Sequence, residues 1–231
     1  MGKQIYYHFL SSQFAINDLE ERRIKVGTLD DLNDPFELEP YLRLPFEERQ
    51  PLHEIRDRLS KTYGLLCFAP DWKQTLLWSH YADGHKGVAI GFEVLRDEEE
   101  VFEVEYAEDP IRRKIQLTGV HETDEKLFLD LARVKYKEWH YEKESRILVK
   151  LEPEMRVHMT CPDRDYYFLS FADGLKVTEI VFGCKFNDER EKGKIKNLAG
   201  QFGAKITYTR PEWQGYNINP DGSKNELYGS I

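Results

Sequence analysis

The stretch WHYEKESRILVKL, residues 139–151, decides the expected fold, because its pattern predicts a helical segment that runs directly into a strand. Side chains two residues apart along a strand share a face, so Glu142, Glu144 and Arg146 are expected to project together. Ile147 and Val149, which follow them, are expected to turn toward the core. Two carboxylates then share one wall of a cleft. Their like charges favour a raised pKa for one of them, whereas Arg146 favours ionisation.

The same residues have a second interpretation. An exposed strand face carrying glutamate and arginine is a common surface ladder, and such pairs contribute little to stability. The alternation alone fits both the cleft and the ladder.

Working outward, apolar periodicity and turn residues predict a mixture of short strands and helices. Strands are expected at residues 4–9, 24–28, 64–68, 87–93, 101–107, 144–151, 166–170, 178–183 and 204–209. Helices are expected after Ser11 or Ser12 and over 46–62, 73–82, 123–139 and about 188–200, the last two beginning at Thr123 and Asn187. A turn is expected at LNDPFE, residues 32–37, and an irregular polar tail from about 211.

The order of these elements predicts an α+β fold with a mixed, largely antiparallel sheet and flanking helices. The 231 residues contain no long low-complexity linker, so one domain spanning 1–231 is expected. Hydrophobic residues make up 40% of the chain and aromatic residues 13%, which suffices for a core without metals or disulfides.

Charge and cysteine content exclude several classes of protein. The formal charge of −9 is dispersed and the basic run at 112–114 is short, whereas general duplex binding needs a concentrated basic surface. Cys67, Cys161 and Cys184 show no CxxC spacing, which predicts a reducing compartment. The opening MGKQIYYHFL resembles no leader peptide and no later segment approaches a membrane span, so a cytoplasmic location without a membrane partner is expected.

A second polar segment is LLWSHYADGHKGVAIGF, residues 76–92. It gathers polar and aromatic side chains in front of a predicted strand, namely Trp78, Ser79, His80, Tyr81 and His85. His80 and His85 are five residues apart and do not share a helix face, so no metal site is expected. Trp78 and Tyr81 are alternatively core residues, and the glycines only make a turn.

A third segment, YYHF at residues 6–9, places His8 on the first predicted strand. No G-x-G-x-x-G or Walker A sequence supports a Rossmann or P-loop site. No G-x-S-x-G elbow supports an α/β-hydrolase.

With these segments the chain resembles the bacterial family called domain of unknown function 2971. The shared marks are YYHF, LNDPFE, LWSHYADGHKGVAIGF, WHYEKESR and IVFG at 180–183. The order of elements is also remotely similar to the ADP-ribosyltransferase fold and its split sheet. That family places His or Arg on a first strand, Ser or Tyr on a central strand and Glu on a late strand. The resemblance maps these positions to His8, to Ser79 or Tyr81, and to Glu142 or Glu144.

The resemblance implies NAD as a substrate. His8 is then expected to hold the adenosine-side ribose, while aromatic faces such as Trp78 and Tyr81, with Ser79 and His80 beside them, bind the rings. The paired glutamates are similar to those of transferases that modify side chains, but the Ser-Thr-Ser that often accompanies them is absent.

The catalytic roles follow from the same resemblance. Glu144 is expected to bond a ribose hydroxyl and stabilise an oxocarbenium-like centre as nicotinamide leaves. Glu142 is expected to orient or deprotonate the acceptor, and Arg146 to fix Glu142 or meet a pyrophosphate.

The leading hypothesis is an NAD-dependent ADP-ribosyltransferase or NAD glycohydrolase, with family context suggesting a toxin in bacterial conflict or phage defence and an unidentified acceptor macromolecule. One alternative is a non-catalytic module that binds a nucleotide or a protein through the aromatic residues. Another is a metal-independent nuclease or hydrolase that uses His80, His85 and the glutamates as acid and base.

Overall fold

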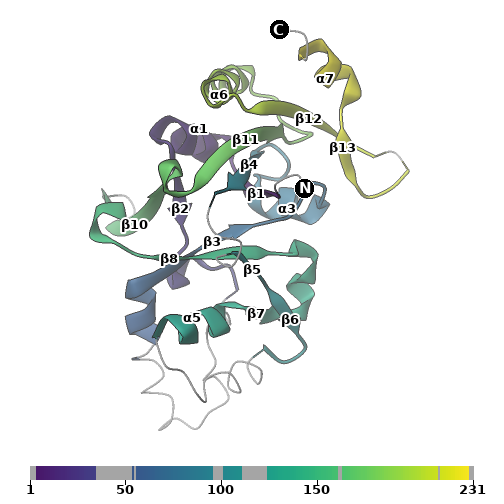
Figure 1. The fold of residues 1–231 in the computed structure, drawn as a ribbon. Helices are drawn as coiled ribbons and strands as arrows, with labels where there is room; N and C mark the ends of the chain where they lie inside the picture. Colours follow the sequence, from purple (N-terminus) through teal and green to yellow (C-terminus); the bar gives the residue numbers. More distant parts are fainter. Residues whose placement is uncertain are drawn as a thin grey trace. The chain divides into compact units, whose positions relative to one another are not determined.

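The computed structural model describes residues 4–34, 54, 56–95, 101–110, 124–160, 163–212 and 214–228. The fold is α+β with a mixed sheet and several helices, as predicted (Figure 1). The chain divides into two compact units, each built from segments that are distant in the sequence. The first comprises Met1–Ile24, Phe68–Arg96 and Ser170–Ile231, and the second comprises Lys25–Cys67 and Asp97–Leu169. The single domain stays a prediction.

A five-stranded sheet forms the first unit, in the order β1-β4-β11-β12-β13. The strands are β1 (Ile5–Leu10), β4 (Val88–Val94), β11 (Leu175–Phe182), β12 (Lys205–Pro211) and β13 (Ile218–Pro220). The pairing of β11 with β12 is parallel, and the other three pairings are antiparallel. The predicted mixed, largely antiparallel sheet is therefore confirmed for this unit.

Two helices of the first unit, α1 (Ser12–Glu21) and α6 (Glu189–Phe202), lie side by side (Figure 1). Ser11 caps α1 by accepting a hydrogen bond from the Phe14 amide. Asp188, not the predicted Asn187, caps α6, because its carboxylate accepts from two amides of the first turn. Gly203 ends α6 at φ 63°, a left-handed conformation that costs glycine little.

The core of the first unit is aromatic on the side of α3 (Thr75–Tyr81). Phe9 of β1 meets Trp78 edge to face with ring centroids 5.0 Å apart. Leu77, Ala89 and Val181 fill the space around this pair. Leu77 and Trp78 thus anchor the helix to the sheet, and Ser79 and His80 are exposed.

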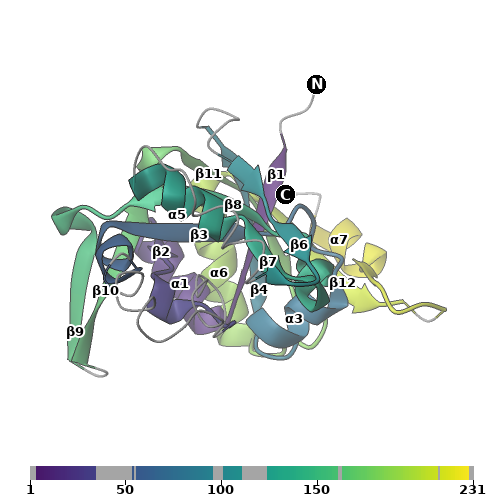
Figure 2. The same ribbon diagram turned by 90° about the horizontal axis from the view of Figure 1, so that it is seen from below.

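Short sheets form most of the second unit, which Figure 2 shows from below. One has the order β3-β8-β5, from β3 (Tyr63–Phe68), β8 (Ser145–Lys150) and β5 (Val101–Glu103). A second has the order β2-β10-β9, from β2 (Arg23–Val26), β10 (Asp163–Ser170) and β9 (Arg156–Thr160). The third pairs β6 (Glu105–Ala107) with β7 (Val134–Tyr136) in parallel. Phe128 of α5 (Asp124–Ala132), fully buried, packs with Leu65 and Phe102 in the core.

The predicted long helix at 123–139 is wrong. Helix α5 ends at Ala132, strand β7 follows at once, and the 3₁₀ helix η3 (Lys137–Glu142) leads to Glu142. The reason is tertiary: Val134, Lys135 and Tyr136 pair with β6, a strand that lies far earlier in the chain. Local periodicity does not reveal a pairing with a distant segment.

Other boundaries also differ from the prediction. The expected strand at 101–107 is interrupted at Val104, whose amide donates to the Glu144 carbonyl. The tail is not irregular throughout, because β13 pairs with β12 and α7 (Gly222–Tyr228) follows it. Strand β9 was not predicted. Several predicted features lie outside the described residues: 46–53 and 55 of the expected helix, 35–37 of the expected turn, the basic run 112–114, Thr123 and Cys161.

Within the described parts of the chain, no helix has both the length and the apolar character needed to cross a membrane.

Candidate functional site

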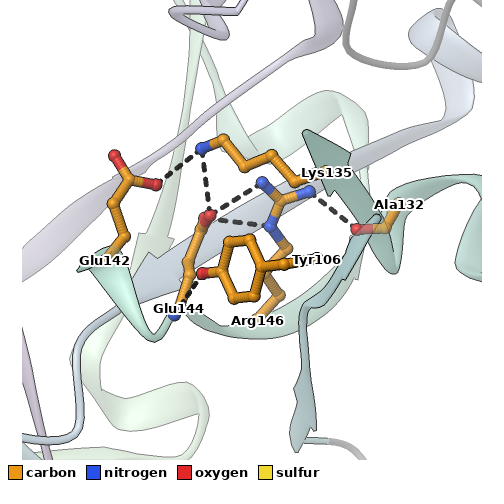
Figure 3. A network of polar contacts seen from close by, with 6 residues as sticks. All are labelled: Tyr106, Ala132, Lys135, Glu142, Glu144 and Arg146. Carbon is orange, nitrogen blue, oxygen red and sulfur yellow. Dashed lines mark hydrogen bonds and ion pairs between the residues drawn. The ribbon is translucent and has the colours of Figure 1, made fainter. Parts of the chain in front are cut away.

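A buried network of charged side chains lies where η3 meets β8 in the second unit (Figure 3). Lys135 comes from β7 and Arg146 from β8, and Glu142 and Glu144 come from the chain between these strands. The ammonium of Lys135 lies 2.7 Å from Glu142 Oε2 and 3.2 Å from Glu144 Oε2. The two predicted carboxylates therefore meet at one cation.

The backbone that brings them together differs from the prediction. Glu142 is the last residue of a 3₁₀ helix, and Glu144 precedes the strand that begins at Ser145. Between them Lys143 has φ 45° and ψ 45°, a left-handed conformation that ends the helix. The shared strand face is therefore wrong, although Ile147 and Val149 do turn into the core as predicted.

Arg146 holds Glu144 through two parallel hydrogen bonds. Its Nε donates to Oε1 and its Nη2 donates to Oε2, both at 2.9 Å. Its Nη1 donates to the carbonyl oxygen of Ala132 at 2.7 Å, so the guanidinium also fixes the end of α5. Arg146 is 0% exposed, and Glu142 and Glu144 are 4% and 7% exposed. The alternative of an exposed surface ladder is therefore wrong.

The electrostatics of Glu144 follow from these partners. Burial acts to raise the pKa of Glu144, but the Arg146 guanidinium and the Lys135 ammonium outweigh burial and hold it at about 2. The like charge of the two carboxylates was expected to raise one pKa and Arg146 to lower it. At Glu144 the positive charges dominate. Glu144 is thus an ionised anchor at neutral pH and has no proton to give as a general acid.

Tyr106 of β6 also contacts the network, at the backbone of Glu144. Its hydroxyl oxygen accepts a hydrogen bond from the Glu144 amide at 2.9 Å. Burial raises the pKa of Tyr106 to about 12, so the phenol stays neutral over the physiological range. The ring of His140 meets Tyr106 edge to face at 5.3 Å.

A partly exposed aromatic rim lies beside the network, formed by Trp139 and Tyr141 of η3. Lys135 Nζ lies 4.9 Å from the centre of the Trp139 ring, a cation–π contact. The rings of Trp139 and Tyr141 are 6.1 Å apart. Burial raises the pKa of Tyr141, and the charge of Glu142 adds to this effect. The sequence Trp-His-Tyr directly before Glu142 could have indicated this aromatic rim, but Trp139 and Tyr141 were not among the predicted site residues.

The remaining predicted site residues belong to the first unit. His8 is half-buried on β1, and its ring meets the edge of Phe68 at 6.1 Å. Trp78 is 0% exposed and its indole N–H donates to the Trp72 carbonyl at 2.6 Å, so it is a core residue and presents no face to a ligand. The convergence of this group with the glutamates stays a prediction.

The other members of this group lie on helix α3. Ser79 and His80 are exposed there, and Tyr81 is half-buried against the aromatic core. The transferase resemblance expects Ser79 or Tyr81 on a central strand, and that placement is wrong for both. Among the residues that the structure describes, no group of three or more His, Cys, Asp or Glu side chains is arranged to hold a metal ion.

Residues 77–147 match the family model described as protein of unknown function (DUF2971). The match bears out the predicted resemblance to this family over that segment of the chain. The DUF2971 segment contains most of α3 and the charged network from Lys135 to Arg146, so residues of both units contribute to it. No curated protein and no solved structure matches the chain.

Proposed function

We propose that the chain uses NAD as a substrate, as an ADP-ribosyltransferase or NAD glycohydrolase, with Glu142 as the working carboxylate. The observation that carries the proposal is the meeting of a carboxylate, a cation and two partly exposed aromatic rings within η3 and β7. A nucleotide ligand needs these groups together: ring faces for the bases and a carboxylate for a ribose hydroxyl.

The roles proposed for the two glutamates differ from those expected from the sequence: Glu142, and not Glu144, contacts the ribose. Glu144 has both oxygens hydrogen-bonded by Arg146 and fixes the network. Glu142 is held by Lys135 through Oε2 and directly follows Tyr141 of the partly exposed rim in η3. Its position next to the rim supports Glu142 as the carboxylate that accepts a ribose hydroxyl.

The proposed chemistry is cleavage of the bond between the ribose and nicotinamide. The bond electrons leave with nicotinamide, positive charge develops on the ribose, and the nearby carboxylate stabilises that charge. Water or an acceptor nucleophile then bonds to the ribose carbon and loses its proton. Because Glu142 is 4% exposed, a rim side chain such as Trp139 must rotate before the ribose reaches it.

The experiment is release of nicotinamide from NAD by the wild type and by Glu142→Gln. The proposal expects turnover to fall at least about 100-fold, because the neutral amide cannot stabilise the developing charge. The matched control is Glu138→Gln, an exposed glutamate of the same 3₁₀ helix, which should keep wild-type turnover. Melting temperatures of both variants separate lost chemistry from lost fold. Wild-type turnover in a folded Glu142→Gln protein would refute the assignment.

A second candidate is a nucleotide-binding module without catalysis. The burial of both carboxylates in a network that pairs two acids with two bases favours it, since such networks serve as internal supports. The module should bind NAD in a calorimetric titration without releasing nicotinamide. Trp139→Ala should then weaken binding, whereas Glu142→Gln should not.

A further inference from the structure

His85 of the first unit has an unusual backbone. Three successive residues, Asp83, Gly84 and His85, have positive φ values of 46°, 59° and 72°. A bulky non-glycine residue in this region is strained, and such strain persists only where the surroundings impose it. The surroundings of His85 must therefore impose its conformation.

Three backbone contacts impose this conformation. The His85 amide donates to the Trp78 carbonyl at 3.0 Å, and the His85 carbonyl accepts from the Lys185 amide at 3.0 Å. Gly183 passes so close that a Cβ there would lie 2.2 Å from the His85 carbonyl oxygen. The loop is thus anchored to α3 on one side and to the end of β11 on the other, which aims the imidazole at a fixed place.

The imidazole lies between a hydroxyl and a thiol. Its Nε2 is 3.0 Å from Ser79 Oγ on α3, a full hydrogen bond. Its Nδ1 is 3.8 Å from Cys184 Sγ, a weak sulfur contact. An imidazole N–H is a better donor than a thiol, so the tautomer with the proton on Nδ1 directs that proton at sulfur and leaves Nε2 as the acceptor for Ser79.

The surroundings keep the imidazole of His85 neutral. His85 is 9% exposed. Burial lowers its pKa and the nearby charge of Lys185 lowers it further, so the ring is neutral at pH 7. Burial also raises the pKa of the Cys184 thiol, which keeps the sulfur uncharged. Ser79, by contrast, is exposed and open to a substrate.

We propose that Ser79 and His85 form a nucleophile and general base for acyl transfer, with an ester carrying an apolar acyl group as substrate. Leu76, a partly exposed apolar residue three positions before Ser79, shares its helix face and favours such an acyl chain. This inference rests on contacts within the first unit and is independent of the NAD proposal.

The proposed steps balance as follows. Ser79 Oγ bonds to the ester carbonyl carbon while its proton passes to His85 Nε2, and the bond from that carbon to the alcohol oxygen breaks. The proton on Nε2 goes to the leaving alcohol. Water then bonds to the acyl carbon while its proton passes to His85 Nε2. The bond from that carbon to Ser79 Oγ breaks, His85 returns the proton to Ser79 Oγ, and the carboxylic acid leaves.

The test uses a fluorophosphonate probe, which phosphonylates activated serines, with peptide mass spectrometry to locate the modified residue. The wild type should be labelled on Ser79, and Ser79→Ala should lose the label. His85→Asn should label at least about 100-fold more slowly, because asparagine tolerates positive φ but is no base. Ser79 Oγ also lies 3.4 Å from the Thr75 carbonyl oxygen of its own helix. Ser60→Ala is the matched control, since Ser60 Oγ makes the same kind of contact, with the Asp57 carbonyl, and the change should leave labelling of Ser79 unchanged.

A second readout is hydrolysis of p-nitrophenyl hexanoate, which should disappear in Ser79→Ala at an unchanged melting temperature. If Ser79 takes no label in the wild type, or if folded His85→Asn labels as fast as the wild type, the contact is only a latch between α3 and the loop and the proposal is overturned.

Discussion

Glu144 illustrates how a single residue can be both highly charged and structural. Its carboxylate receives two hydrogen bonds from Arg146 and one from Lys135, and its amide donates to Tyr106. Removing one partner of such a group leaves the others buried and unbalanced, which costs more than the pair contributes net. The residue is therefore expected to matter first for folding.

Glu144→Gln should lower the free energy of unfolding by roughly 3–5 kcal/mol, the usual cost of breaking a buried ion pair. Gln keeps the size of the side chain but leaves the two cations with less negative charge nearby. Urea unfolding of this variant beside exposed Glu138→Gln measures the effect. A loss as small as that of the control would show that the network contributes little.

The pH dependence of stability has a defined sign at this residue. The folded pKa of Glu144 is about 2, below its ordinary value of 4.5, so its contribution is present above pH 4.5 and is lost as pH falls toward 2. Stability should therefore fall as the pH drops through this window, because protonation of Glu144 removes its attraction to the Arg146 and Lys135 cations. Urea unfolding from pH 6 to pH 2 measures it. The Glu144→Gln protein should show a flatter dependence, and identical slopes would contradict the assignment.

At the scale of elements, local signals were informative where local contacts decide the structure. Strands β1, β3, β4, β8, β11 and β12, and helices α1, α3 and α6, lie where periodicity and capping residues placed them, within a few residues. Residues 134–139 were predicted as part of a helix, because the pairing of β7 with β6 is set by residues distant in the sequence.

The same limit applies to the candidate site. Glu142, Glu144 and Arg146 were found from their spacing, and their proximity is confirmed. Lys135 was missed because its role depends on β7, which the predicted helix concealed. Ser79 and His85 were both named in the second polar segment, but their contact was not predicted, because it depends on the turn with three positive φ values.

The cap of α6 gives a prediction at this scale. Asp188→Ala should lower the free energy of unfolding by about 1 kcal/mol, because two amides of the first turn lose their acceptor. Asn187→Ala is the control and should have little effect. Thermal or urea unfolding of the two variants decides between them, and equal losses would contradict the observed cap.

For the whole molecule, each unit has its own core and its own candidate chemistry. The first contains the aromatic cluster with Phe9 and Trp78, and the Ser79–His85 pair. The second contains the cluster around Phe128, and the charged network with its aromatic rim. Each chemistry can therefore be tested by changing residues in one unit while the other serves as an internal reference.

The most direct measurement of the central proposal is an NMR titration of the tryptophan indole N–H signals with NAD. The chain has 4 tryptophans, and Trp139→Phe assigns the signal of the rim. We expect NAD to shift the Trp139 signal and to leave the signal of fully buried Trp78 in place. A spectrum in which NAD at millimolar concentration leaves the Trp139 signal unmoved would contradict it.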